Sequence, residues 1–131
     1  MSNVDDMLSS ARAAMVNAYA PYSRFRVGAC IRSEDGRLHA GCNVENAAYP
    51  QSQCAEATAI GAMAAAGGRR ITEVLVVAEG AALCTPCGGC RQRLSEFAPP
   101  DTPVHLCGPE GLRKTMTLGE LLPLSFGPHS L

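Results

Sequence analysis

Two short cysteine motifs constrain this chain more than any other feature of its sequence. Cys87 and Cys90 form a Cys-x-x-Cys pattern at the expected start of one helix, and Cys54 stands at the expected start of another. Alone, a Cys-x-x-Cys pattern is typical of half a zinc site or of a redox-active pair. Cys54 favours the metal, because two helix starts can meet at one edge of a sheet and bring three thiols together. Both helix dipoles would then favour the thiolate form.

The composition indicates a cytoplasmic protein in which cysteines bind metal or are reactive thiols. Seven cysteines occur among 131 residues, and the acidic, polar start of the chain does not resemble a secretion signal. An odd number of cysteines without such a signal argues against a disulfide framework. The formal net charge is −1 and the basic residues are scattered. We therefore expect neither a nucleic-acid polymer nor a membrane as a partner.

The order of hydrophobic segments predicts one domain over residues 1–131, a three-layer α/β/α arrangement around a mixed sheet. The expected helices cover residues 4–18, 54–66 and 87–97. The expected strands cover residues 25–31, 38–44, 72–78, 103–107 and 116–118, the first two as a hairpin around Asp35-Gly36. We expect the strand at 25–31 to be half-buried and the strand at 72–78, with its apolar run Val74–Val77, to be central and buried. The residues after 118 are expected to form a coil tail.

Three cysteine ligands leave one position of a tetrahedral zinc ion open, which is the pattern of a catalytic site. A structural site would need a fourth ligand, and His39, His105 and His129 do not stand at zinc-finger spacing from the cysteines. Glu56, two residues after Cys54, would point away from the metal but could reach a water on it. An isolated glutamate in a first helical turn is more often a solvated residue favoured by the helix dipole. Within this pattern, we interpret Glu56 as a proton shuttle.

The two motifs resemble the signature of zinc-dependent nucleoside and nucleobase deaminases, with cysteine in place of the usual histidine ligand. Further segments are similar to the small cytidine deaminase family, in the same order along nearly the whole chain. They are residues 21–29, 43–50 and 121–128. The resemblance implies hydrolytic deamination of cytidine and deoxycytidine to uridine and deoxyuridine, in pyrimidine salvage. It also implies one Zn²⁺ per chain, no organic cofactor, a mixed five-stranded sheet and a homotetramer with active sites at subunit contacts.

The resemblance assigns substrate contacts to residues near the metal. Asn43 and Glu45 would hydrogen-bond the ribose, and Phe25 would pack on the base. Ala55 would present its backbone to the pyrimidine ring, and Glu56 would contact N3 and the exocyclic amine. Outside this family pattern, Phe25 would be interpreted as a core residue and the Asn-x-Glu pair as the end of a strand.

Further contacts would come from neighbouring subunits. By the same resemblance, Ala47 and Tyr49 would approach from one neighbour, and Phe126 would cap the base from another. Taken alone, Tyr49 would be a packed surface aromatic residue and Phe126 part of a tail. The four other cysteines are expected to be small hydrophobic residues or incidental thiols. Of these, Cys84 lies nearest in sequence to the proposed metal ligand Cys87.

One position departs from the family pattern. Many relatives with three cysteine ligands carry arginine directly after the catalytic glutamate, where this chain has Ala57. Three thiolates and Zn²⁺ leave a net negative charge, and an ionised Glu56 adds to it, so a compensating cation is expected. We hypothesise that Arg91, directly after Cys90, supplies this charge together with backbone N–H groups. The alternative is that Arg91 is an ordinary surface arginine.

Other functions remain open from the sequence. A deaminase of polynucleotides would need a basic groove and stacking platforms, which the near-neutral charge and the absence of Trp disfavour. A deaminase of a nucleoside antibiotic such as blasticidin S is the closest enzymatic alternative. A redox protein using Cys87 and Cys90, or a non-catalytic zinc-binding module, would belong to a different class.

Overall fold

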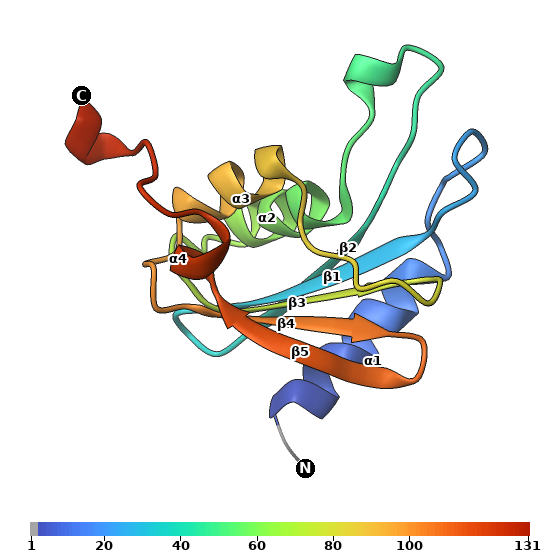
Figure 1. Ribbon diagram of the computed structural model, residues 1–131, viewed down its shortest axis with the longest axis horizontal. Helices are drawn as coiled ribbons and strands as arrows, with labels where there is room; N and C mark the ends of the chain where they lie inside the picture. Colours follow the sequence, from blue (N-terminus) through green and yellow to red (C-terminus); the bar gives the residue numbers. More distant parts are fainter. Residues whose placement is uncertain (1–2) are drawn as a thin grey trace.

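A mixed five-stranded sheet organises the chain, of which the computed structural model describes residues 3–131 (Figure 1). The elements are α1 (Asn3–Met15), β1 (Val27–Ser33), β2 (Leu38–Cys42), η1 (Tyr49–Gln51), α2 (Ala55–Ala65), β3 (Ile71–Ala78), α3 (Gly88–Ser95), β4 (Pro103–Gly108), β5 (Gly111–Thr117), α4 (Leu118–Leu121) and η2 (Pro128–Ser130). The strands lie in the order β2-β1-β3-β4-β5, and only the β3–β4 pair is parallel. No helix in this range is long and apolar enough to cross a membrane.

Helices cover both faces of the sheet, which confirms the predicted three-layer arrangement. Figure 1 shows α1 on one face and α2, α3 and α4 on the other. Side chains of the central strand β3 alternate between the two resulting cores: Val74 and Val76 pack toward α2 and α3, and Leu75 and Val77 toward α1. The prediction of a buried central strand at this position is therefore confirmed.

The prediction for the first strand was wrong in two respects. β1 is buried over Gly28–Ile31 rather than half-buried, because α1 and α2 cover its two faces. It also begins at Val27 rather than at Phe25. The backbone N–H of Phe25 donates to Ser23 Oγ (3.1 Å) and that of Arg26 donates to Glu79 Oε1 (2.9 Å). Side-chain acceptors therefore take the place of a strand partner there.

Two strand glycines allow helices to pack directly against the sheet. A Cβ atom at Gly28 would lie 2.1 Å from the carbonyl oxygen of Ala11 in α1. A Cβ atom at Gly41 would lie 2.7 Å from the carbonyl oxygen of Ala55 and 2.5 Å from the nitrogen of Ala59. The first turn of α2 is therefore seated on the backbone of β2, which fixes the position of Cys54 and Glu56.

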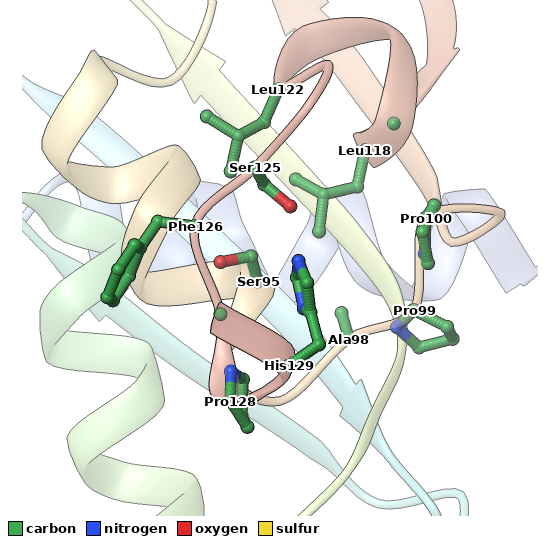
Figure 2. A pocket seen from close by; sticks show the side chains of 12 residues that line it. Ser95, Ala98, Pro99, Pro100, Leu118, Leu122, Ser125, Phe126, Pro128 and His129 are labelled. Atoms are coloured by element: carbon green, nitrogen blue, oxygen red, sulfur yellow. The ribbon is translucent and has the colours of Figure 1, made fainter. Parts of the chain in front are cut away.

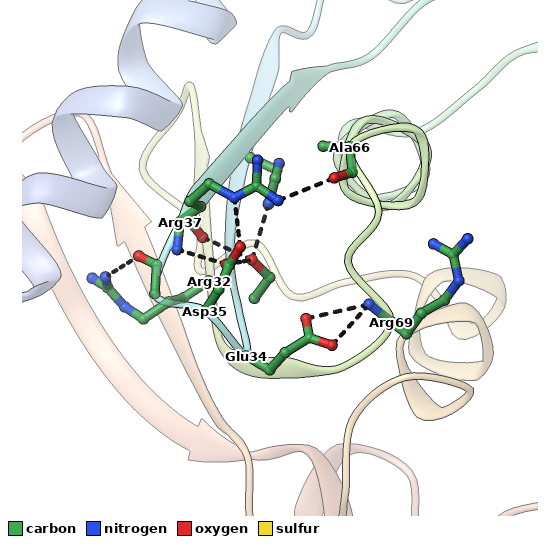
Figure 3. A network of polar contacts seen from close by, with 9 residues as sticks. Arg32, Glu34, Asp35, Arg37, Ala66 and Arg69 are labelled. Atoms are coloured by element: carbon green, nitrogen blue, oxygen red, sulfur yellow. Dashed lines mark hydrogen bonds and ion pairs between the residues drawn. The ribbon is translucent and has the colours of Figure 1, made fainter.

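A polar network ties the β1–β2 hairpin to the opposite end of α2 (Figure 3). Asp35 accepts hydrogen bonds from Ser33 Oγ (2.6 Å) and from the backbone and side chain of Arg37. Arg37 Nη2 in turn donates to the carbonyl oxygen of Ala66, the C-cap of α2, at 3.0 Å. The last carbonyl oxygens of a helix have no backbone N–H partner within the helix. Arg37 of the hairpin supplies a donor for one of them.

The C-terminal region is more ordered than expected. β5 begins at Gly111, and residue 118 starts the helix α4 instead of ending a strand. Thr117 and Glu120 form a capping box at the start of α4, and Leu118 and Leu121 are buried. At the other end of the chain, the first helix stops at Met15 rather than at residue 18.

Candidate metal centre and active site

Three cysteine sulfurs meet where α2 and α3 begin. Cys54 is the N-cap of α2, Cys87 is the N-cap of α3, and Cys90 lies in the first turn of α3. The three Sγ atoms lie within 4.8 Å of one another, and those of Cys54 and Cys87 are 3.9 Å apart. Sulfurs bound to a tetrahedral zinc ion at about 2.3 Å are about 3.8 Å apart. The sulfurs therefore fit three corners of a zinc site, and no other His, Cys, Asp or Glu within residues 3–131 joins the group.

The surroundings of the sulfurs favour a thiolate at Cys54, whereas a hydrogen bond with Cys54, burial and the nearby Glu56 raise the pKa of Cys90. Each of the two helices directs the positive end of its dipole toward the group. The backbone N–H of Cys90 also donates to Cys87 Sγ at 3.4 Å. Hydrogen bonds from Cys90 and Cys87, together with the positive charge of Arg93, lower the pKa of Cys54 to about 6 despite its partial burial. One sulfur of the group is thus ready to lose its proton to a metal at neutral pH.

Glu56 is a buried carboxyl beside this group. It is the second residue of α2 and only 4% of its surface is exposed. Burial raises the pKa of Glu56, and the negative charge that develops on Cys54 raises it further. A raised pKa moves the proton affinity of the carboxyl group toward neutral pH, which favours general acid–base catalysis.

A pocket of about 280 Å³ opens over Cys54, Cys87 and Glu56. It is lined by Ser23, Phe25, Val27, Asn43, Glu45, Cys54, Ala55, Glu56, Cys84, Thr85 and Cys87. The structure therefore brings together the predicted metal-binding residues and the predicted contacts from Phe25, Asn43, Glu45 and Ala55. A volume near 300 Å³ is at the lower end of the range for small-molecule sites.

Asn43 is already engaged by the protein. Its Oδ1 accepts a hydrogen bond from the backbone of Val27 (2.9 Å), and its Nδ2 donates to the carbonyl oxygen of Phe25 (2.8 Å). The amide therefore fixes the segment that carries Phe25 into the pocket. One N–H and one lone pair of the amide remain for a ligand.

Glu45 is held by the loop that precedes β1. Its carboxylate accepts hydrogen bonds from the backbone N–H groups of Tyr22 (3.0 Å) and Ser23 (3.1 Å) and from the Ser23 hydroxyl. These bonds, that of the Ser23 side chain first, lower the pKa of Glu45 below its ordinary value. The carboxylate therefore faces the pocket as an oriented anion, which suits recognition of sugar hydroxyls.

Sequence reasoning gave no role to several residues of this pocket. Ser23 lies in a segment that resembles the family, but its sequence position alone does not indicate that it orients Glu45. Thr85 and Cys84 line the pocket beside Cys87. The only sequence feature that singles them out is their position directly before Pro86-Cys87, and the sequence alone favours a small hydrophobic residue or an incidental thiol at Cys84.

The residues expected from neighbouring subunits lie outside this pocket. Ala47 is exposed, and Tyr49 is 70% exposed and contacts Tyr22 edge-on, with ring centroids 5.9 Å apart. Phe126 is 61% exposed and belongs to the C-terminal tail, which borders a separate pocket of about 230 Å³ between α3 and α4 (Figure 2). Ser95 and His129 project into that second pocket. The structure of one chain therefore does not bring these three residues to the cysteines.

Arg91 binds three oxygen atoms, two of them in the loop that precedes Cys87. It donates to the carbonyl oxygens of Pro86 (2.7 Å) and Leu121 (2.8 Å) and to the hydroxyl of Thr85 (3.0 Å). Within residues 3–131, none of its hydrogen bonds reaches a cysteine sulfur. Arg91 thus joins the loop before Cys87 to the end of α4, and it is partly buried rather than an ordinary surface residue.

Comparisons with known proteins agree on one family and one fold. Residues 1–106 match the family model described as the cytidine and deoxycytidylate deaminase zinc-binding region. The chain is 38% identical over 129 residues to a cytidine deaminase of Sporosarcina psychrophila, covering 98% of this chain and 95% of the relative. It is 40% identical to one of Mycobacterium tuberculosis, covering 100% and 96%. The crystal structure of cytidine deaminase from Burkholderia pseudomallei matches with a TM-score of 0.89 and 41% identity, over 96% of this chain and 100% of that one.

Proposed function

The chain belongs to the cytidine deaminase family of zinc-dependent hydrolases, and on this premise we propose that its pocket hydrolyses both cytidine and deoxycytidine, giving uridine and deoxyuridine. The observation that carries the proposal is the meeting of three cysteine sulfurs beside a pocket that is lined by the buried carboxyl of Glu56 and by the polar side chains of Asn43 and Glu45. A redox pair would explain Cys87 and Cys90 but neither Cys54 nor Glu56.

We propose Zn²⁺ as the metal, held by Cys54, Cys87 and Cys90. The donor set supports it, since three thiolates select zinc over the hard cations and leave one open position. When bound, Zn²⁺ lowers the pKa of a coordinated water to about 7 and so supplies a nucleophile at neutral pH.

In this proposal Glu56 moves the protons. It takes a proton from the attacking water, whose oxygen adds to C4 of the cytosine ring, and it delivers that proton to N3. It then carries the second proton of the water to the exocyclic amine, which leaves as ammonia. Water and cytidine thus give uridine and ammonia, and Glu56 returns to its starting state. Its burial supports the role, because a raised pKa brings its proton affinity closer to neutral pH.

The other pocket residues bind and orient the nucleoside. Glu45, oriented by Ser23, and the free N–H of Asn43 hydrogen-bond the ribose hydroxyls. Phe25 packs against the base, and the backbone of Ala55 contacts the pyrimidine ring. A blasticidin-type substrate is disfavoured because this sugar-binding pair suits an unmodified ribose.

We also propose that the enzyme is a homotetramer that works in the cytoplasm in pyrimidine salvage. Support comes from large hydrophobic residues that remain exposed in the single chain, Tyr49 and Phe126 among them. In the tetramer, Ala47 and Tyr49 of one neighbour and Phe126 of another complete each pocket.

The test is a loss of cytidine absorbance with purified protein, together with metal analysis and the variant Glu56→Gln. We expect zinc in both proteins and turnover in the wild type, with turnover lowered by about 10²- to 10⁴-fold in Glu56→Gln. Zinc without turnover of cytidine or deoxycytidine would favour a non-catalytic zinc module. A protein that purifies without zinc and forms a disulfide would be a redox protein.

A further inference from the structure

The cysteine group carries more negative charge than one divalent cation neutralises. Three thiolates with Zn²⁺ retain one negative charge, and an ionised Glu56 beside them adds a second. Excess negative charge weakens the metal as a Lewis acid and opposes ionisation of its water. Because Ala57 follows Glu56 in this chain, no cation stands at that position of α2.

Arg91 does not point its charge at the sulfurs. Its guanidinium is fixed on the oxygens of Pro86, Thr85 and Leu121. These bonds hold the loop in place, and they direct the Arg91 N–H groups away from the thiolates.

Arg93 is directed at the group instead. It lies four residues after Gly89 on α3, and helical side chains fold back over the preceding turn. The position that a Gly89 Cβ would occupy is 3.2 Å from Arg93 Nη1 and 4.0 Å from Cys87 Sγ. Since glycine leaves that space empty, the Arg93 guanidinium and Cys87 Sγ border the same unoccupied position. The charge of Arg93 acts on Cys54 as well.

No other interaction of Arg93 explains this placement. Within residues 3–131 its side chain forms no hydrogen bond or ion pair. It lines a surface hollow between α2 and α3 together with Ala57, Ile60 and Glu96, but no ion pair within residues 3–131 joins it to Glu96. Ala57, the residue directly after Glu56, lines the same hollow with only a methyl group.

We propose that Arg93 is the cation that offsets the thiolate charge of the metal centre, acting from α3 in the role that an arginine at position 57 of α2 would fill. The proposal rests on the proposed function, because it concerns the zinc-loaded site. Arg93 is a positioning and charge-balancing residue rather than a catalytic one, since it does not line the substrate pocket.

The test compares zinc affinities by competition with a chromophoric chelator, using Arg93→Gln, the double variant Arg93→Gln/Ala57→Arg, and the control Arg70→Gln. Arg70 is an exposed arginine beyond the far end of α2, so its variant changes the net charge equally. We expect Arg93→Gln to bind zinc about 10- to 100-fold more weakly, the double variant to recover most of this loss, and Arg70→Gln to match the wild type. The melting temperature of the metal-free proteins should not differ, because the charge acts on the metal-loaded state.

Unchanged zinc affinity in Arg93→Gln would overturn the inference. An equal loss in Arg70→Gln would overturn it too, because net charge and not position would then be responsible. A wild-type protein that holds no zinc would instead overturn the proposed function, so the two failures are distinguishable.

Discussion

Single side chains of the pocket are oriented before any substrate enters. The Ser23 hydroxyl and two backbone N–H groups hold Glu45, and the amide of Asn43 spans the strand start between Phe25 and Val27. Such bonds lower the cost of ordering these groups when the nucleoside binds. The residues next to the sugar are therefore fixed by partners outside the site.

Removing the Ser23 hydroxyl should release Glu45. The bond from Ser23 is the largest cause that lowers the pKa of Glu45 from its ordinary value of 4.5. In Ser23→Ala we expect that pKa to rise toward 4.5 and KM for cytidine to rise more than kcat falls. Carboxyl-carbon NMR titration measures the first and steady-state kinetics the second. Because the folded-state pKa is lowered, the stabilisation from this carboxylate is present above pH 4.5 and is lost as the pH falls further.

An unchanged Glu45 titration in Ser23→Ala would show that the two backbone donors suffice. Ser33→Ala is a suitable control, since its hydroxyl donates to Asp35 in the hairpin and not to the pocket.

The role of a residue was predictable from the sequence where both its side-chain chemistry and its spacing from other residues indicate the same site. Three cysteines and a glutamate at helix starts indicate a metal site, and the structure brings these four residues together. The roles of Ser23 and Arg93 were not predictable, because they depend on which way a side chain turns. Arg91, next to Cys90, was the natural candidate for charge balance, yet its guanidinium binds the loop carbonyls.

At the scale of elements, the metal centre depends on how closely α2 approaches the sheet. The glycines of β1 and β2 permit contacts between helix and strand backbones that any side chain would block. α1 rests on Gly28 and α2 on Gly41, so on each face of the sheet a glycine allows a helix to contact the strand backbone. Only the second contact bears on the cysteines and Glu56.

Substitutions at the two glycines should therefore have similar effects on stability but different effects on metal binding. We expect Gly28→Ala and Gly41→Ala each to lower the free energy of unfolding by about 1 to 3 kcal/mol through overpacking. Gly41→Ala should in addition weaken zinc binding and turnover, since it displaces the first turn of α2. Urea denaturation and chelator competition on the folded proteins check this. Equal zinc affinities in the two variants would contradict the argument.

The buried thiols under α1 should make the fold sensitive to alkali. Burial raises the pKa of both Cys30 and Cys107 from 9.0 to about 11. The unfolded chain then releases these protons near pH 9 while the folded chain keeps them, so stability is full below pH 9 and declines as the pH rises toward 11. We expect Cys30→Ala to reduce this decline by about 1 to 2 kcal/mol. Denaturation midpoints from pH 7 to pH 11 measure it, and a slope equal to that of the wild type would refute it.

The sequence predicted elements with strong apolar runs and missed those without them. The run Val74–Val77 predicted the buried central strand correctly. β5 carries polar and charged residues over much of its length, so only its end was expected, and α4 depends on a four-residue capping box. β1 was expected to be half-buried because the periodicity of one strand does not show that helices from both sides will cover it.

At the scale of the whole molecule, two segments extend beyond the three layers. Figure 1 shows the loop that carries η1 and the C-terminal tail projecting from the side of the sheet covered by α2 and α3. The loop exposes Tyr49, the tail exposes Phe126, and the tail is tied to α3 by Gln92 Nε2, which donates to the carbonyl oxygen of Phe126 (3.0 Å). Exposed aromatic residues on projecting segments are typical of surfaces that a second copy covers.

If Phe126 completes the pocket of a neighbouring subunit, two impaired variants should complement each other. Glu56→Gln impairs proton transfer but keeps Phe126, whereas Phe126→Ala keeps Glu56 and loses an aromatic contact worth on the order of 1 kcal/mol beyond its buried area. In tetramers refolded from an equal mixture, roughly one site in four combines a native Glu56 with a native Phe126 from its neighbour. Activity above the mean of the two separately refolded variants is the expected result, measured at subsaturating cytidine. A control mixture of Phe126→Ala with the double variant Glu56→Gln/Phe126→Ala contains no such site and should give only the mean. If the first mixture also gave only the mean, Phe126 would act within its own chain or not at all.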